Sequence, residues 1–304
     1  MAVGEHLGEG FMKNLFQASL LSAVISLALV TTAASQQLYA TSETLLQLDL
    51  VTLPVGTVTK LFTTPGKPDS VLLNAQGQLI YTMSPQGTVA LFDPVAGTNT
   101  ILLSGLKSPR DLLFDPGSTT SMLISEYSIG TILRYNFVSG TSTVLAKKLG
   151  SVDGLAYDPQ GDLFAIANHN TIVQLDPNTG AILKTLVLET HYKVNGGDGM
   201  VYDPYTQNLW VSHDGANATT GAKESGFFEI PTDLSGFTLF QDGTLLKKSI
   251  AVPVPDGIVS DGKGNLYVGA GLQRLVVYNI PTDTVTLNPV VPGIDSLILV
   301  PGSY

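Results

Sequence analysis

Short runs of alternating apolar and polar residues fill most of the chain, and tight turns separate them. In residues 153–188 the run DGLAY is followed by the turn DPQGD, then by LFAIA and TIVQLD, a second turn PNTG, and AILKTLVL. A two-residue period rich in Val, Ile, Leu and aromatic side chains is typical of half-buried β-strands, and Asp-Pro, Asn and Gly are typical of hairpin turns. This segment therefore predicts four consecutive antiparallel strands.

The same pattern recurs along the chain and opens each time on an aspartate. The openings are 39 to 58 residues apart, at Asp69, Asp111, Asp153, Asp198, Asp256 and Asp295. This spacing matches the length of a propeller blade. Residues 37–62 match 162–186 from the second strand onward, and residues 294–300 can supply the missing first strand. We therefore predict an all-β fold, a six-bladed β-propeller with four-stranded blades, whose ring closes by joining N-terminal strands and the C-terminal strand in one blade.

The first residues follow a different pattern. From Met12, a lysine and an apolar stretch at 15–30 lead to small residues at 32–35, which is the layout of a secretory signal peptide. The apolar stretch is short for a bilayer span, which needs about 20 apolar residues. We expect residues 1–35 to be upstream residues and a signal peptide, and residues 36–304 to be a single propeller domain, secreted and without a stable membrane anchor.

The amino-acid composition of the chain limits which partners it can bind. The chain has 304 residues, 44% hydrophobic and 13% charged, so it can bury a large core, and it contains no cysteine. A net charge of −10 with only 15 Lys and Arg gives no basic surface to neutralise phosphates. We expect no nucleic-acid partner, and a cation or a neutral small molecule is the better ligand.

Propeller geometry brings the opening aspartates together. The first strand of each blade is innermost, so its first residues surround the mouth of the central channel. Converging carboxylates repel one another unless a cation joins them or their pKa values rise, and oxygen ligands suit Ca²⁺ or Mg²⁺. We expect such a cation, with the metal ligands Asp256, Asp198, Asp153, Asp69 and Asp295. The alternative is that these residues only form turns, because Asp side chains satisfy nearby backbone N–H groups.

The ends of the second strands lie at the same face of the disk. Three residues there have side chains that can move a proton, and we take them as candidate catalytic residues: His213, Glu126 and His169. Four more are candidates for substrate binding: Arg110, Asp111, Asn168 and Asp214. The alternative for each histidine is a solvated or hydrogen-bonded loop residue. No serine-nucleophile elbow, zinc-protease motif or phosphate-binding glycine loop occurs in the sequence.

The stretch PDGIVSDGKGNLYV at 255–268 resembles the gluconolactonase and senescence-marker-protein family of six-bladed propellers, and more loosely the NHL-repeat and streptogramin-lyase propellers. The resemblance implies a divalent cation in the channel, held by a Glu, two Asn and the Asp of a Pro-Asp-Gly motif, which Asp256 matches. The other ligands depart from the family pattern: Asp153-Gly154 and Asp198-Gly199 in place of Asn-Gly, Arg110 in place of an Asn, and Asp69 or Asp295 in place of the Glu. A guanidinium at this place can pair with the carboxylates instead of a metal.

Three functions remain open at this stage. The first is hydrolysis of an ester or lactone, in which the divalent cation polarises the carbonyl group and lowers the pKa of a bound water. The second is a non-catalytic secreted scaffold that binds a ligand or partner at the same face. The third is a carbon–oxygen lyase like the streptogramin lyases. The fold does not choose among them, because propellers host both enzymes and binding proteins.

Overall fold

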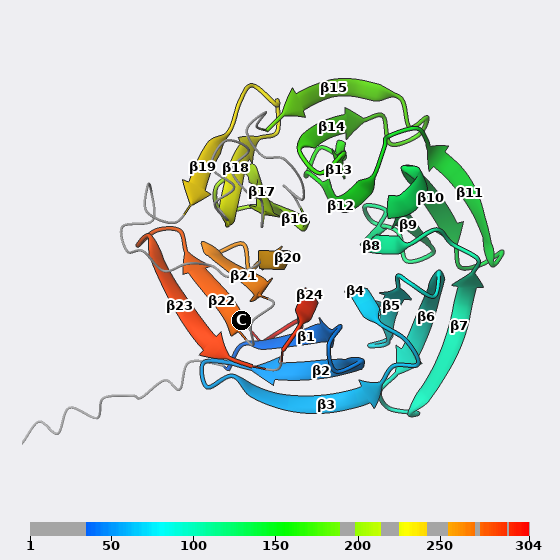
Figure 1. Ribbon diagram of the computed structural model, residues 1–304, viewed down its shortest axis with the longest axis vertical. Coiled ribbons are helices and arrows are strands. Elements are labelled where there is room, and N and C mark those ends of the chain that lie inside the picture. The colour runs from blue at the N-terminus through cyan, green and yellow to red at the C-terminus, as the bar shows by residue number, and fades with distance from the viewer. Residues whose placement is uncertain are drawn as a thin grey trace, which may run out of the picture. The chain divides into compact units, whose positions relative to one another are not determined.

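A computed structural model describes residues 35–188, 198–213, 225–241, 255–270, 274–290 and 292–303. Within these ranges the chain forms six four-stranded sheets arranged in a ring, which confirms the predicted six-bladed β-propeller (Figure 1). Residues 1–34 lie outside the described residues, so the signal peptide stays a prediction. No helix in the described part of the chain has the length and apolar character needed to cross a membrane.

The blades follow one another along the chain, and all strand pairs within them are antiparallel. The first three blades, each written from the innermost strand outward, are blade 1 with β24 (Ile294–Leu299), β1 (Gln37–Ser42), β2 (Gln47–Thr52) and β3 (Thr57–Thr63); blade 2 with β4 (Pro68–Leu73), β5 (Leu79–Met83), β6 (Thr88–Asp93) and β7 (Thr98–Ser104); and blade 3 with β8 (Pro109–Phe114), β9 (Ser121–Glu126), β10 (Thr131–Asn136) and β11 (Thr141–Ala146). A single turn of 3₁₀ helix, η1 (Tyr127–Ile129), follows β9.

The remaining blades have the same strand order. They are blade 4 with β12 (Val152–Tyr157), β13 (Leu163–Ala167), β14 (Thr171–Leu175) and β15 (Ile182–Val187); blade 5 with β16 (Met200–Asp203), β17 (Asn208–His213), β18 (Gly226–Pro231) and β19 (Thr238–Gln241); and blade 6 with β20 (Pro255–Ser260), β21 (Asn265–Ala270), β22 (Arg274–Asn279) and β23 (Thr284–Pro289).

The ring closes in blade 1, where the last strand of the chain pairs with the first. Leu38 of β1 faces Leu299 of β24, and Ala40 faces Leu297. Going round the ring, β24 also contacts the innermost strands on both of its sides, β4 and β20 (Figure 1). The predicted closure is therefore confirmed, and it leaves β1 without an open inner edge.

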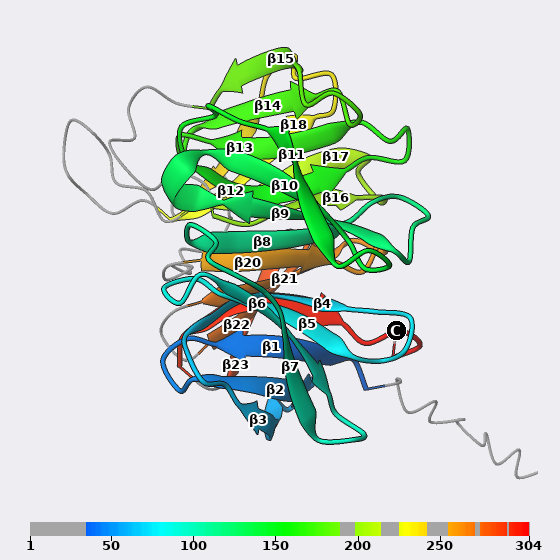
Figure 2. The same ribbon diagram turned by 90° about the vertical axis from the view of Figure 1, so that its right-hand side faces the viewer.

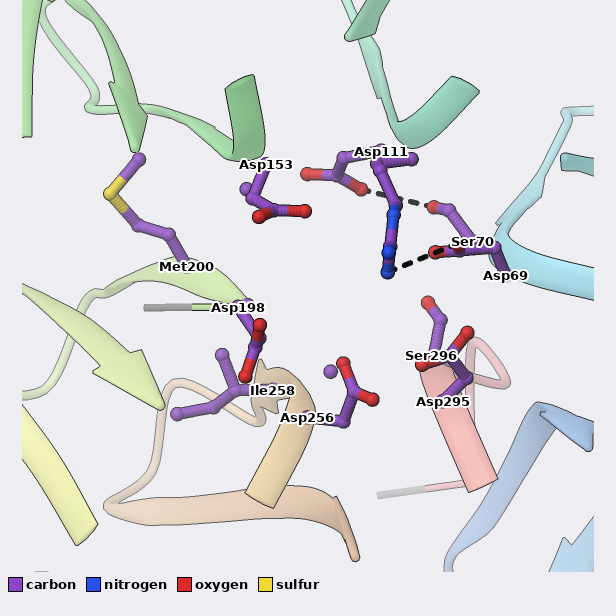
Figure 3. Close-up of a pocket in the computed structure, with 14 residues that line it drawn as sticks. Asp69, Ser70, Asp111, Asp153, Asp198, Met200, Asp256, Ile258, Asp295 and Ser296 are labelled. Carbon is purple, nitrogen blue, oxygen red and sulfur yellow. Dashed lines mark hydrogen bonds and ion pairs between the residues drawn. The ribbon is translucent and has the colours of Figure 1, made fainter. Parts of the chain in front are cut away.

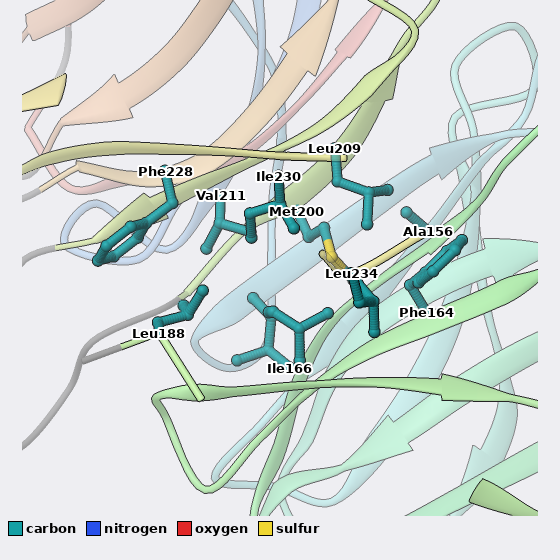
Figure 4. Packing of buried hydrophobic residues seen from close by; sticks show 11 residues of the cluster. Ala156, Phe164, Ile166, Leu188, Met200, Leu209, Val211, Phe228, Ile230 and Leu234 are labelled. Atoms are coloured by element: carbon teal, nitrogen blue, oxygen red, sulfur yellow. The ribbon is translucent and has the colours of Figure 1, made fainter. Parts of the chain in front are cut away.

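The core lies between neighbouring blades. Figure 4 shows one cluster, in which Phe164 and Ile166 of blade 4 pack with Leu209, Val211 and Phe228 of blade 5. A second strand such as β13 is buried at every position because a neighbouring blade covers each of its faces, whereas the outermost β15 is mostly exposed. Burying a Leu or Phe side chain stabilises a fold by about 1.5–3 kcal/mol, so these contacts hold the blades side by side. Figure 2 shows the stacked strands from the edge of the disk.

Glycines in the innermost strands let neighbouring blades approach backbone to backbone. A Cβ atom on Gly257 would lie 2.4 Å from the Asp295 carbonyl oxygen, and one on Gly199 would lie 2.8 Å from the Asp256 carbonyl oxygen. The Gly154 N–H donates a hydrogen bond of 3.1 Å to the Asp198 carbonyl oxygen. The glycine of each repeated Asp-Gly pair is therefore required by close packing around the channel, independently of what the aspartate does.

Candidate ligand site at the channel mouth

A cavity of about 60 Å³ lies at the mouth of the channel, where the innermost strands begin. Figure 3 shows carboxyl groups from different blades around this common space. The charged residues that line it are Asp69, Arg110, Asp111, Asp153, Asp198, Asp256 and Asp295. The cavity has room for a few water molecules or for one small cationic group, because a water molecule occupies about 30 Å³ of liquid.

The strand register corrects the sequence alignment in blade 3. Pro109 pairs with the last residue of its second strand, as Pro68 and Pro255 do in their blades. The next residue in each strand stands at the ring position, which makes it Arg110 in blade 3 and not Asp111. The ring therefore contains five aspartates and one arginine, where the sequence alignment placed six aspartates.

Arg110 is the cation of this ring. Its Nη1 lies 3.4 Å from Asp69 Oδ2, and its guanidinium lies over the ring of Tyr127, 4.9 Å from the centroid. Burial disfavours the charge of Arg110, but the carboxylates around it, Asp69 first, outweigh burial and raise the pKa of the guanidinium. Its buried Nε has no hydrogen-bond partner within the described residues. Arg110 therefore stays charged and neutralises part of the ring.

Burial and mutual repulsion raise the pKa values of the ring carboxyl groups. Burial raises the pKa of Asp153 to about 7, although the charge of Arg110 counteracts it. Burial and the charge of Asp295 raise the pKa values of Asp69 and Asp256 well above the usual range for a carboxyl group. Asp153, Asp69 and Asp256 therefore hold their protons to a higher pH than ordinary carboxyl groups do.

Asp256 and Asp295 share a hydrogen bond between their carboxyl groups. This bond and the charge of Asp295 raise the pKa of Asp256 beyond the effect of burial. The same bond lowers the pKa of Asp295, which burial nevertheless keeps above its usual value. Two carboxylates cannot form a hydrogen bond with each other without a proton, so the pair shares one.

Asp111 links three blades. Its Oδ1 accepts hydrogen bonds from the Ser70 hydroxyl at 3.0 Å and the Leu112 N–H at 2.8 Å, and its Oδ2 accepts one from the Leu155 N–H at 2.7 Å. Burial raises the pKa of Asp111 to about 6, while these donors oppose the shift. The carboxylate is thus engaged by donors from blades 2, 3 and 4.

Of the catalytic candidates, His213 and Glu126 are buried, and none of the three lines the cavity. His213 is fully buried with its ring 4.6 Å from that of Phe228, and burial lowers its pKa to about 4. Glu126 accepts the Lys107 N–H at 2.8 Å, which fixes the preceding loop. His169 Nε2 lies 3.1 Å from the hydroxyl oxygen of Tyr127.

Only some of the substrate-binding candidates lie at the channel mouth. Arg110 and Asp111 line the cavity, whereas Asn168 is an exposed residue with a φ of 48° beside His169. Asp214 lies outside the described residues.

The residues at the channel mouth do not fit a directly coordinated metal in this arrangement. Within the described residues, no group of three or more His, Cys, Asp and Glu side chains is arranged to hold a metal ion. The carboxyl groups are distributed around the ring, Arg110 stands among them, and Asp256 is bonded to Asp295. The Ca²⁺ or Mg²⁺ expected from the sequence stays a prediction.

Several second strands carry a hydroxyl side chain one residue before their end. These hydroxyl groups hold the backbone of the ring in place. The Thr82 hydroxyl accepts the Ser70 N–H at 2.9 Å and donates to the Arg110 carbonyl oxygen at 3.3 Å, which joins blades 2 and 3. Ser212 makes the same connection between Gly199 and the Asp256 carbonyl oxygen. The sequence signal for these links is the repeated hydroxyl column Thr41, Thr82, Ser125 and Ser212. Sequence reasoning missed this column, and it also missed Tyr127 under Arg110.

No protein-family model matches the sequence, and no curated protein matches it either. Solved structures of the same fold do match. A virginiamycin B lyase from Staphylococcus aureus is 15% identical, with a TM-score of 0.59, over 84% of this chain and 84% of its own. A streptogramin B lyase is 12% identical, with a TM-score of 0.60, over 88% of this chain and 94% of its own. A chain of a nidogen/laminin complex is 11% identical, with a TM-score of 0.66, over 87% of this chain and 98% of its own.

At these identities the likeness concerns the fold. The streptogramin lyases among these structures share the predicted six-bladed propeller fold, while kinship with gluconolactonases stays a prediction. The class that fold and site define together is a six-bladed β-propeller with an acidic channel mouth.

Proposed function

We propose that this propeller is a binding protein whose channel mouth receives the ammonium group of a small organic ligand. The observation that carries the proposal is that six carboxyl groups, five of them from the ring and the sixth from Asp111, line a single cavity of about 60 Å³ together with one guanidinium. Burial makes their mutual repulsion costly, and an incoming cation relieves it. The raised pKa values of Asp153, Asp69 and Asp256 reflect the same burial and repulsion.

An ammonium group suits this ring better than a directly bound metal. It donates three hydrogen bonds to acceptors about 2.7–3.2 Å away, so it can be held by carboxyl groups on different blades. A divalent metal needs several oxygens at about 2.0–2.6 Å, which is a tighter cluster. The spread of the carboxyl groups around the ring favours the first mode.

The arrangement favours binding over hydrolysis. A general acid or base must lie within hydrogen-bond reach of the reacting group. His213 is buried against Phe228, and Glu126 is held by the Lys107 N–H. The ring itself supplies charge and hydrogen-bond acceptors, which are the properties of a recognition site.

A calorimetric titration at pH 8 tests the proposal, with butylammonium as the probe and butanol as the neutral analogue of the same shape. We expect saturable binding of butylammonium, no binding of butanol, and at least a tenfold weaker affinity in Asp153→Asn, since one charge-assisted hydrogen bond contributes about 1.5–3 kcal/mol. Asp261→Asn, on the opposite face, is the matched control and should bind like the wild type. Equal affinity in Asp153→Asn would contradict the proposal. So would binding of Ca²⁺ or Mg²⁺ without binding of the amine.

A second candidate is a carbon–oxygen lyase, which we propose because His169, Tyr127 and Arg110 form a connected path to the ring. The His169 Nε2 to Tyr127 Oη distance is 3.1 Å, and the Tyr127 ring lies under the guanidinium. His169 would act as the base that removes a proton from the substrate, with Arg110 holding the departing oxygen. Turnover of virginiamycin B, the compound in the name of the lyase compared above, that is lost in His169→Ala and retained in His213→Ala would support this candidate, and no turnover would remove it.

A further inference from the structure

A second cavity lies between blades 4 and 5, at the end of the strands away from the ring. Its volume is about 350 Å³, and Asp158, Asp162 and Gln174 line it from blade 4. Tyr202 and Asp233 line it from blade 5, and Tyr202 packs against the apolar cluster of Figure 4. Asp153 is the second residue of β12 and Asp158 follows its end, so the two cavities open at opposite faces of the disk.

The equivalent place between blades 3 and 4 is filled by a guanidinium. Arg134 donates from Nε to Asp115 Oδ2 at 2.8 Å and from Nη2 to Asp115 Oδ1 at 3.0 Å. Arg134 Nη2 also donates to the Pro177 carbonyl oxygen at 2.7 Å, and the Tyr157 hydroxyl donates to Asp115 Oδ1 at 2.8 Å. The guanidinium is thus clamped between the two blades.

One blade further on, the same positions lack the guanidinium. Asp158 replaces Asp115 after the first strand, and Tyr202 replaces Tyr157 in the following blade. The fourth residue of the third strand is Arg134 in β10 and Gln174 in β14. Blade 4 and blade 5 therefore keep the aspartate and the tyrosine that surround Arg134 one blade earlier. The arginine itself is replaced by glutamine, which is shorter and neutral.

The exchange leaves a buried polar atom of this second cavity without a partner. Gln174 is buried, and its Oε1 has no hydrogen-bond partner among the residues that the structure describes. Asp158 is also buried; its Oδ1 accepts the backbone N–H groups of Gln160 and Asp162, at 3.0 and 2.9 Å. A buried acceptor such as Gln174 Oε1 is normally satisfied, so it indicates a missing donor.

We propose that this second cavity is a binding site for a guanidinium group, carried by a small molecule or by an arginine side chain of a peptide. The guanidinium takes the place that Arg134 occupies one blade earlier and donates to Asp158 Oδ2 and Gln174 Oε1. Three carboxylates, on Asp158, Asp162 and Asp233, outnumber the ammonium of Lys184, so the charge suits a cation. The volume admits the group together with a short chain, because ligand pockets begin at about 300 Å³.

The test compares Nα-acetyl-argininamide with its neutral analogue Nα-acetyl-citrullinamide, by calorimetric titration of the full chain at pH 7.5. We expect saturable binding of the arginine compound and none of the citrulline compound. Gln174→Arg restores the basic side chain of the preceding blade, so it should fill the second cavity and weaken binding at least tenfold. Gln76→Arg places the same charge on an exposed turn of blade 2 and should bind normally.

Two further arms separate the alternatives. Propylguanidine and an acetylated peptide with a central arginine compare the two sources of the guanidinium, and saturable binding of either one supports the site. Asp153→Asn alters only the channel mouth and should leave binding unchanged. Equal affinity in wild type and Gln174→Arg, or no binding of any guanidinium compound, would overturn the proposal. The unfolding midpoint of Gln174→Arg shows whether this variant is folded, and Asp158→Asn supplies an independent loss of affinity of at least tenfold.

Discussion

Removal of residues 294–304 is expected to abolish the cooperative unfolding transition of the propeller. The deletion takes away β24, the innermost strand of blade 1, with its buried residues Ile294 and Leu297. It also exposes the inner edge of β1 and separates blade 6 from blade 2. The lost burial alone is on the order of 5 kcal/mol, which is comparable with the whole stability of many domains. Thermal unfolding followed by circular dichroism, together with binding of a dye for exposed apolar surface, measures the effect.

A shorter deletion is the control for this prediction. Removing only residues 301–304 keeps β24 and loses the hydrogen bonds of the Ser303 hydroxyl with Gln36 and Gln37. We expect this variant to unfold cooperatively with a slightly lower midpoint, since two or three such bonds contribute about 1 kcal/mol each. A sharp transition at the wild-type midpoint in the longer deletion would show that ring closure by β24 is not required.

Asp256→Asn is expected to make the unliganded protein more stable at pH 8 and to stabilise it by a smaller margin at pH 5, since the unfolded-state pKa of an aspartate is about 3.9. Burial and the charge of Asp295 raise the pKa of Asp256 in the folded state. A raised pKa means that the folded state binds the proton more tightly than the unfolded state, so stability falls as pH rises through the folded-state pKa. The amide keeps a donor toward Asp295 and cannot ionise. We therefore expect a higher unfolding free energy than that of the wild type at pH 8, in proportion to the pKa shift, because each pKa unit corresponds to about 1.4 kcal/mol.

Urea unfolding at pH 5 and pH 8 measures this difference. The matched control is Asp261→Asn, in the hairpin turn of the same blade, where the carboxylate accepts the N–H groups of Lys263 and Asn265. This control removes native hydrogen bonds and should lose stability at both pH values. If Asp256→Asn were less stable than the wild type at pH 8, the ring would be stabilised by an ionised Asp256, contrary to our interpretation.

The blade pattern could be predicted because its signals are local. Alternating apolar residues and turn residues specify each hairpin, and the repeat of the whole pattern specifies how many hairpins there are. The closure in blade 1 followed from the missing first strand at residues 37–62. The hairpins needed no long-range pairing, the repeat itself indicated the one that closes the ring, and the structure confirms both.

The positions of the aspartates in the sequence do not by themselves determine which residue of each innermost strand stands in the ring. Alignment by aspartates placed Asp111 in the ring, whereas the strand pairing of Pro109 with Glu126 places Arg110 there. A shift of one residue reverses the side to which a strand residue points, so it changes the chemistry of the position. The prolines Pro68, Pro109 and Pro255, which begin three of the innermost strands, are the signal that fixes the register.

The burial of His213 depended on packing within its own blade. Its column at the end of the second strands also contains Met83, Ala167 and Ala270, all of them buried, but the polar residues Ser42 and Glu126 as well. His213 lies against Phe228 of the next strand in the same sheet. The sequence showed that the residue lies near one face of the disk, but the direction of its side chain comes from contacts between residues far apart in the chain.

The central claim is that a cationic group enters a channel mouth whose carboxyl groups hold protons. Its most direct test is the number of protons released when butylammonium binds, measured between pH 6 and pH 8 by calorimetry in buffers with different ionisation enthalpies. Because the pKa of Asp153 is raised to about 7 and those of Asp69 and Asp256 are raised further, we expect the protein to release protons on binding, and the affinity to rise with pH. Binding without proton release, or with an affinity that is constant over this range, would contradict the account.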